Sequence, residues 1–277
     1  MCRPLFPDEP VRELVTRVPT LYQRRLTLTV RTPRELLVPL VTPVLFAVII
    51  APALASIIAA PGARTAYMTF VALATAGLLI PLNTLFSGVG VIVDRQQGAQ
   101  RELLVAPISR ASIVTGNMLA AVSITALQVA VLVACAALRG ATFVSGRHLV
   151  WFLAAALAFS VLMYAVAELL ASRLPSPEAY IGAVPAVAIV PWFLAGTLYP
   201  VTALPHWLTD VARALPLTHA LALLRYGLTS DGTAALSNIW GMKSPAAMAA
   251  LSLAVVCCYA VAATVAAMRI AARRGVQ

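Results

Sequence analysis

The sequence predicts an all-α integral membrane protein with six transmembrane helices. Hydrophobic residues make up 61% of the chain and charged residues 11%, with a mean hydropathy of +0.91. A chain of this composition cannot keep its apolar surface out of water by folding as a single soluble core. Crossing a hydrocarbon layer of about 30 Å takes roughly 20 helical residues, and apolar runs of that length occur six times. They are Leu36–Ala60, Ala66–Val93, Ala111–Leu138, Leu149–Leu170, Ala179 to about Leu204, and Ala246–Met268.

We interpret these runs as helices because backbone polar groups in lipid must find partners within the protein. We expect one transmembrane domain over residues 1–277, with a cytosolic or interfacial segment at 1–35, a six-span bundle at 36–268 and a cytosolic tail at 269–277. The first eight residues lack the charged-then-apolar order of a cleaved signal peptide, so we expect the first span to stay in the mature protein.

The basic residues are distributed unevenly between the two sides of the predicted bundle. If both termini are cytosolic, fourteen of the 20 Lys and Arg residues fall in inner segments and six in outer ones. This bias predicts a multi-pass protein of the plasma or inner membrane with both termini in the cytoplasm. It also accounts for the formal charge of +10 without nucleic acid as a partner.

An amphipathic helix is predicted before the first span. Apolar residues between Val11 and Tyr22 recur at helical spacing, with arginines on the remaining surface, which is typical of a helix lying on the inner membrane face. It could contact anionic lipid or a partner subunit, and the sequence leaves both open. The order Thr32-Pro33-Arg34-Glu35 predicts the start of the first span, with Thr32 as N-cap. Kinks are expected at Pro39, Pro43 and Pro52.

The second run carries no charge from Ala66 to Val93. At 1.5 Å per residue it would be about 42 Å long, which exceeds the hydrocarbon thickness, so it must tilt or project beyond the lipid. Gly88 and Gly90 near its inner end permit either a bend or close helix packing, and packing is favoured.

A charged segment, Asp94–Arg110, separates the second and third runs. Gly98 and Pro107 bracket about two helical turns, in which Leu103 and Leu104 form an apolar knob among charges of both signs. An apolar anchor within a charged rim suits docking to another protein, although spacing alone fits an ordinary solvated loop equally well. The candidate docking residues are Asp94, Arg95, Gly98, Arg101, Glu102, Leu103, Leu104, Pro107 and Arg110.

The region before the last span contains two short stretches with apolar helical spacing, 207–215 and 217–228, separated by Pro216. They are too short to span, which predicts an outer re-entrant or interfacial hairpin. The residues assigned to this hairpin are Gly196, Pro200, Pro205, Trp207, Pro216, His219 and Arg225. His219 and Arg225 fall on separate helix faces, so we do not expect them to pair, and each is expected to be an interfacial anchor.

The sequence contains no pattern for catalysis. The only lysine, Lys243, follows Met242, so the chain has no phosphate-binding loop, and neither a His-Glu-x-x-His pattern nor a Gly-x-Ser-x-Gly elbow occurs. We expect neither a metal nor a cofactor in this chain. Glu168, near the inner end of the fourth span, is expected to reach the interface or to pair with Arg173 rather than to relay protons.

The segments Asp94–Arg110, Gly196–Leu208 and Pro216–Arg225 together resemble the type-2 permeases of ATP-binding-cassette exporters, in their drug- and antibiotic-resistance branch. The resemblance implies a non-catalytic permease subunit that forms a path for an amphipathic drug, antibiotic, lipid or glycolipid-type cargo. It implies a cytosolic coupling helix after span two that docks on a separate ATPase, which binds ATP and Mg. It also implies a second permease copy or paralogue, and a hairpin that closes the outer mouth.

Two other functions remain open on the residues alone. One is an ion- or proton-coupled secondary transporter that uses Glu168, although no internal repeat is evident. The other is a membrane scaffold that transports nothing. Vesicle transport with and without an ATPase partner and ATP would separate the three hypotheses.

Overall fold

A computed structural model describes residues 9–58, 63–96, 110–144, 146, 148–229 and 232–273. In this part of the chain all regular elements are helical. They are α1 (Glu9–Arg31), α2 (Pro33–Leu45), a π-helical turn (Phe46–Ile50), α3 (Ala51–Ile58), α4 (Arg64–Gln96), α6 (Arg110–Leu138), α7 (Leu149–Arg173), α8 (Pro177–Leu194), a 3-10 turn (Val201–Ala203), α9 (His206–Ala214), α10 (Pro216–Leu228), α11 (Thr233–Trp240) and α12 (Pro245–Arg273).

Six helices in the described residues are long and apolar enough to cross a membrane, which confirms the predicted all-α, six-span class. The first combines α2, the π-helical turn and α3, and the others are α4, α6, α7, α8 and α12. The predicted boundary of the fifth span was wrong, because α8 ends at Leu194 rather than near Leu204. Gly196 follows with a φ of +70°, a left-handed conformation that cannot continue a right-handed helix.

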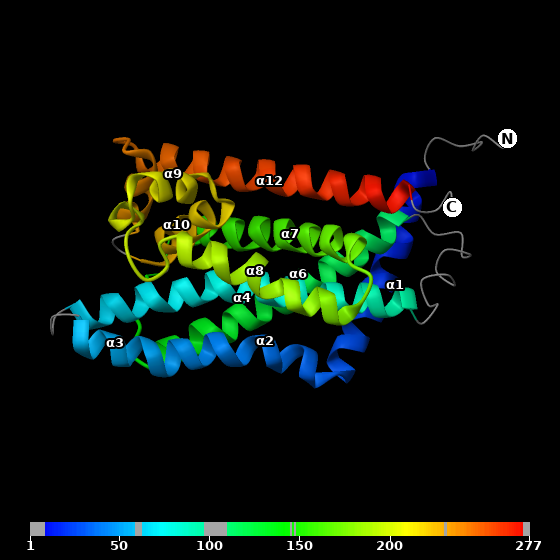
Figure 1. Cartoon of the computed structure of the whole chain (residues 1–277), viewed down its shortest axis with the longest axis horizontal. Coiled ribbons are helices and arrows are strands. Elements are labelled where there is room, and N and C mark those ends of the chain that lie inside the picture. The colour runs from blue at the N-terminus through cyan, green and yellow to red at the C-terminus, as the bar shows by residue number, and fades with distance from the viewer. Residues whose placement is uncertain are drawn as a thin grey trace.

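The spans run side by side, and the remaining helices gather at the two ends of the bundle (Figure 1). One end, here called the termini end, holds the start of α1, the end of α4, the start of α6 and the end of α12. Helix α1 lies across this end. The opposite end, here called the hairpin end, holds α9, α10 and α11 together with the start of α4.

Helix α4 forms the centre of the bundle. Every residue from Val71 to Pro81 is buried, and α4 packs against α2, α6, α7, α8 and α10. Its 33 residues correspond to about 50 Å at 1.5 Å per residue, so the second span is longer than a hydrocarbon layer, as predicted. A helix that is apolar on all sides is expected to be surrounded by other helices.

Side chains of α8 donate hydrogen bonds to backbone carbonyls of α4. The Trp192 indole N–H reaches the Ala74 oxygen at 2.8 Å, and the Tyr180 hydroxyl reaches the Leu85 oxygen at 2.7 Å. Both side chains are buried. These bonds satisfy polar groups that would otherwise be stranded in an apolar core, and they fix α8 against α4 at two heights.

Gly88 and Gly90 allow close packing, which is the interpretation that the sequence analysis favoured over a bend. A Cβ at Gly88 would collide with the Tyr180 hydroxyl and lie 3.3 Å from the Ala167 oxygen. A Cβ at Gly90 would collide with the guanidinium of Arg25, which reaches α4 from α1. Glycine at these positions therefore lets a buried phenol and a buried cation approach the α4 backbone.

The first span begins at Pro33 as predicted, but Thr32 does not cap it. Its hydroxyl donates to the carbonyl oxygens of Leu28 at 2.8 Å and Thr29 at 3.3 Å. The reason is that α1 continues to Arg31, so the last carbonyls of α1 lie closer to Thr32 than the first amides of α2. Kinks were expected at three prolines of this span; helix α2 continues through Pro39 and Pro43, and a π-helical turn follows before Pro52, where the Ala51 N–H donates to the Phe46 oxygen.

We expect Gly88→Ala to destabilise the bundle by about 1–3 kcal/mol, since the added methyl group displaces Tyr180 from its bond to Leu85. The measurement is the thermal midpoint of the detergent-solubilised protein. Gly182→Ala on α8 is the matched control because its Cβ would meet nothing within 4 Å. Equal midpoints for the two variants would contradict the packing assigned to Gly88.

Candidate functional site

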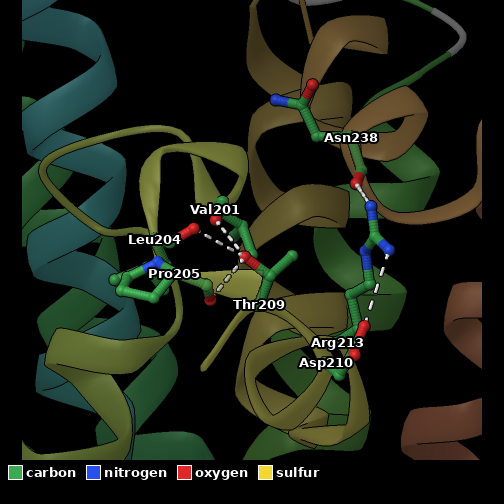
Figure 2. Close-up of polar contacts among 7 residues, drawn as sticks. All are labelled: Val201, Leu204, Pro205, Thr209, Asp210, Arg213 and Asn238. Carbon is green, nitrogen blue, oxygen red and sulfur yellow. Dashed lines mark hydrogen bonds and ion pairs between the residues drawn. The ribbon is translucent and has the colours of Figure 1, made fainter. Parts of the chain in front are cut away.

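The two short helices predicted before the last span are present as α9 and α10, each preceded or opened by a proline. Pro205 precedes α9 and Pro216 opens α10, where a missing N–H costs no helical hydrogen bond. The Thr209 hydroxyl lies within hydrogen-bond distance of three carbonyl oxygens, those of Val201 at 3.2 Å, Leu204 at 3.1 Å and Pro205 at 3.3 Å (Figure 2). This contact folds α9 back onto the segment that follows α8.

A third short helix, α11, belongs to the same unit and was missed in the sequence. Arg213 of α9 donates to the Asn238 carbonyl oxygen of α11 at 3.2 Å and lies 3.9 Å from the Asp210 carboxylate (Figure 2). Both charged side chains are well exposed, so the ion pair contributes little. The carbonyl contact nevertheless joins α9 to α11.

Helix α10 lies inside the bundle, packed against α7, α12 and α4, and all its residues from Leu217 to Leu228 are buried. The expectation that His219 and Arg225 are interfacial anchors was therefore wrong, because they are only 3% and 6% exposed. They contact different partners and do not pair, as predicted. Trp207 of α9 is 68% exposed, in keeping with an interfacial position.

Arg225 ties α10 to the turn after α8. Its guanidinium donates to the Gly196 oxygen at 3.0 Å and the Thr197 oxygen at 2.7 Å, and its carbon lies 3.5 Å from the ring centroid of Phe70 on α4. Among the described carboxylates none forms an ion pair with it. Burial lowers the pKa of Arg225 to about 9, which still leaves the side chain cationic at neutral pH.

The turn that receives Arg225 depends on glycine. Gly196 has a φ of +70°, and a Cβ there would lie 2.5 Å from a methyl group of Val201. Pro200 then begins the 3-10 turn, whose Ala203 N–H donates to the Pro200 oxygen at 2.9 Å. The sequence assigned both residues to the predicted hairpin, but it did not predict that this turn binds a buried arginine.

His219 closes a hydrogen-bonded chain between α9, α10, α11 and α12. A carbonyl only accepts, so Nε2 of His219 carries the hydrogen that is donated to the Arg213 oxygen at 2.8 Å. Nδ1 then accepts from the Ser252 hydroxyl at 3.3 Å, and Ser252 accepts from the Trp240 indole N–H at 2.8 Å. Burial lowers the pKa of His219, partly opposed by the bond to the Arg213 oxygen.

A cavity of about 630 Å³ lies at the hairpin end, between α4, the segment after α8, α10 and α11. Its wall includes Tyr67 and Phe70 of α4, Arg225 of α10 and Asn238 of α11. The volume falls within the range of small-molecule pockets. Exposed residues such as Ala66 and Ala234 are part of the lining, so the cavity opens to the surface.

At the termini end, Asp94 and Arg95 hold the last turn of α4. Arg24 of α1 lies 3.9 Å from the Asp94 carboxylate. Arg95 donates to the carbonyl oxygens of Leu174 at 2.9 Å and Ala171 at 3.3 Å, at the end of α7. These two predicted docking residues therefore connect α4 to α1 and α7 within the chain.

The rest of the predicted docking segment lies outside the described residues. This applies to Gly98, Arg101, Glu102, Leu103, Leu104 and Pro107. Arg110 opens α6, but its side chain is not among those described. The coupling assignment of these residues stays a prediction.

The comparison with known families matches residues 16–229 to the ABC-2 type transporter model. The chain belongs to the ABC-2 type transporter family. The match runs from within α1 to the residue after α10, so it includes the hairpin, Arg225 and both ends of the docking segment. No curated protein matches the chain.

Membership of the ABC-2 family, with six apolar helices, makes the chain a multi-pass membrane permease component of an ABC transporter. The cavity at the hairpin end and the residues at the end of α4 are then the two regions of functional interest. Within the described residues, no group of three or more His, Cys, Asp and Glu side chains could hold a metal ion.

Glu168 of this ABC-2 chain lies in a polar cluster near the termini end, and it forms no ion pair with Arg173, which was one of the two alternatives expected for it. Its carboxylate accepts from the Tyr164 hydroxyl at 2.5 Å and interacts electrostatically with Arg25. Arg25 is 9% exposed and donates to the Ser87 oxygen at 3.0 Å. Arg25 comes from α1, which the sequence placed on the membrane face, so this buried partner could not be foreseen.

Stability is expected to fall as the pH is lowered from about 8 to about 5.5, because the fold favours neutral His219. The folded-state pKa lies below the ordinary value of 6.5, so the unfolded chain binds this proton more readily. The stabilisation that neutral His219 contributes to the folded protein is therefore fully present above pH 6.5 and is lost as the pH falls toward the folded-state pKa. The measurement is the thermal midpoint as a function of pH.

His219→Gln should flatten this pH dependence, since glutamine does not titrate. His206→Gln replaces the exposed histidine that opens α9 and is the matched control. It should leave the pH dependence as in the unmodified protein. A pH profile unchanged by His219→Gln would show that the buried imidazole does not set it.

Proposed function

We propose that the chain is the permease subunit of an ATP-driven exporter that moves an amphipathic drug, antibiotic, lipid or glycolipid-type cargo. The observation that carries this proposal is the ABC-2 family match over residues 16–229 of a chain with six apolar spans. The chain lacks a phosphate-binding loop, so the energy must come from a separate ATPase subunit that binds ATP and Mg²⁺.

The docking surface for that ATPase is the segment between α4 and α6. Leu103 and Leu104 supply its apolar anchor, and Arg101 and Glu102 supply charges beside it. Directly before this segment, Asp94 contacts Arg24 of α1 and Arg95 donates to the Leu174 oxygen after α7. Through them, a push on the segment would reach α1 and α7 as well as α4.

The push must be strong enough to reverse a conformational equilibrium. Inverting a two-state population from 1:99 to 99:1 takes about 5.5 kcal/mol of differential interaction, which must enter through this contact. A second copy of the chain or a paralogue completes the transport path. The termini end faces the cytosol, where fourteen of the 20 basic residues then lie.

Replacing Leu103 and Leu104 by Asp is expected to lower ATP-driven export by about thirtyfold or more, since buried apolar anchors dominate docking energies. Exchanging the charges with Arg101→Glu and Glu102→Arg should also weaken docking. The measurements are ATP-dependent uptake into inside-out vesicles and co-purification with the ATPase subunit, after insertion has been verified.

Lys243→Glu is the control for this experiment, because Lys243 is an exposed charge before α12 at the opposite end of the bundle. Export by this variant should match the unmodified chain. If the Leu103 and Leu104 variants export normally, the segment does not transmit force and the proposal fails.

The orientation predicts opposite labelling of two single cysteines placed in a chain whose own four cysteines are replaced by Ala. Lys243→Cys should react with a membrane-impermeant maleimide on intact cells. Gln100→Cys should react only after the membrane is opened, because its segment faces the ATPase. The reverse pattern would place the docking segment outside the cell and refute the function.

A further inference from the structure

Arg225 carries a buried positive charge, and its partners among the described residues are all neutral. They are two carbonyl oxygens and the face of Phe70, and a ring face offsets only part of the cost of desolvating a cation. The Nε atom of Arg225 and the hydroxyl of neighbouring Thr197 are buried, and neither has a hydrogen-bond partner in the part of the chain that the structure describes. Buried polar atoms of this kind are rare and need an explanation.

The charge lies in the wall of the cavity at the hairpin end. Among the described residues that line this cavity, Arg225 is the only charged one, and no carboxylate takes part. The rest of the wall is largely apolar, with Tyr67 and Phe70 stacked at a centroid distance of 6.3 Å. Asn238 adds a neutral polar side chain, and in Figure 2 its carboxamide makes no contact with the other residues drawn.

The positive charge of Arg225 determines which charge a ligand of this cavity should carry. In a site of low dielectric constant, a buried guanidinium attracts an anion and repels a cation. Carboxylate and phosphate groups also match the planar donor geometry of arginine. The apolar and aromatic wall suits a hydrocarbon or ring portion next to the anionic group.

We propose that this cavity binds the anionic head group of an amphipathic molecule, with Arg225 as its counter-ion and Tyr67 and Phe70 against the apolar part. This assignment rests on the proposed function, because it names the class of cargo. An anionic bilayer lipid and a free anionic amphiphile share this chemistry. Binding needs neither ATP nor an ATPase, so it is tested independently of transport.

The test compares two probes with the same chain and fluorophore, dansylamino-undecanoic acid, which is ionised at neutral pH, and its uncharged methyl ester. They are titrated into the full-length protein in phosphatidylcholine nanodiscs, and empty nanodiscs supply the background. The carboxylate should bind at least about tenfold more tightly than the ester, as a charge-assisted hydrogen bond implies. Equal affinities of the unmodified protein for the two probes would overturn the proposal without any variant.

Variants then test whether Arg225 is the residue that causes the preference for the carboxylate probe. Arg225→Lys should keep the preference for the carboxylate, and Arg225→Gln should abolish it. Arg213→Gln is the matched control, because Arg213 is a nearby arginine on α9 that does not line the cavity. It should bind both probes normally. Loss of the preference in Arg213→Gln, or its persistence in a folded Arg225→Gln, would overturn the assignment.

The cavity itself is tested by a variant that leaves the hairpin contacts intact. Ala66→Trp places a large side chain on the exposed rim formed by α4 and should weaken binding of both probes by about tenfold or more. Undiminished binding would show that the probes bind elsewhere. This variant also decides the outcome if Arg225→Gln does not fold.

Two further experiments test whether the bound anion is a bilayer lipid, a free amphiphile or a carboxylate of the chain itself. Added phosphatidylglycerol should displace the carboxylate probe if the occupant is a bilayer lipid, and should leave its binding unchanged if the occupant is a free amphiphile. Asp231, which lies outside the described residues, is the acidic residue nearest to Arg225 in the sequence. If only the Asp231→Asn variant prefers the carboxylate probe, then Asp231 of the chain itself is the counter-ion of Arg225, and the proposal is overturned.

Discussion

The structure depends on one constraint, which is that polar groups within an apolar bundle must be satisfied by the protein itself. Here the acceptors are mostly backbone carbonyls. Trp192 and Tyr180 donate to α4, Arg25 donates to α4 from α1, and Arg95 donates from α4 to the end of α7. The geometry of the bundle therefore follows from which side chains reach which carbonyls of their neighbours.

This constraint explains why α4 needs glycine where it does. A carbonyl on a buried helix is accessible to a phenol or guanidinium only if no Cβ lies in between, and Gly88 and Gly90 remove that obstacle for Tyr180 and Arg25. The same principle operates at the hairpin end, where Gly196 turns the chain so that its carbonyl faces Arg225. Close backbone approach and polar satisfaction are thus achieved together.

The sequence predicted the six spans and the two hairpin helices because long apolar runs and flanking prolines are direct local signals. It did not predict the burial of His219 and Arg225, since their main partners are carbonyl groups, which every residue carries and which leave no pattern. The role of Thr32 depended on where α1 ends, and the buried position of Arg25 depended on how α1 crosses the bundle. Both are tertiary facts that override local capping and amphipathic patterns.

The ion pair at the last turn of α4 and the contacts of the hairpin end differ in how much they resist exchange with water. Arg24 and Asp94 are 35% and 22% exposed, so separating them costs on the order of 0–1 kcal/mol. Arg225 and His219 are buried, and leaving such a group unpaired costs about 1–3 kcal/mol or more. Releasing the Arg24–Asp94 pair would therefore cost less than releasing Arg225 or His219, whereas buried Arg25, near the same end as that pair, resists release as the hairpin contacts do. Because α4 reaches both ends as one helix and packs against α10, its displacement is the most direct way for the first event to affect the second.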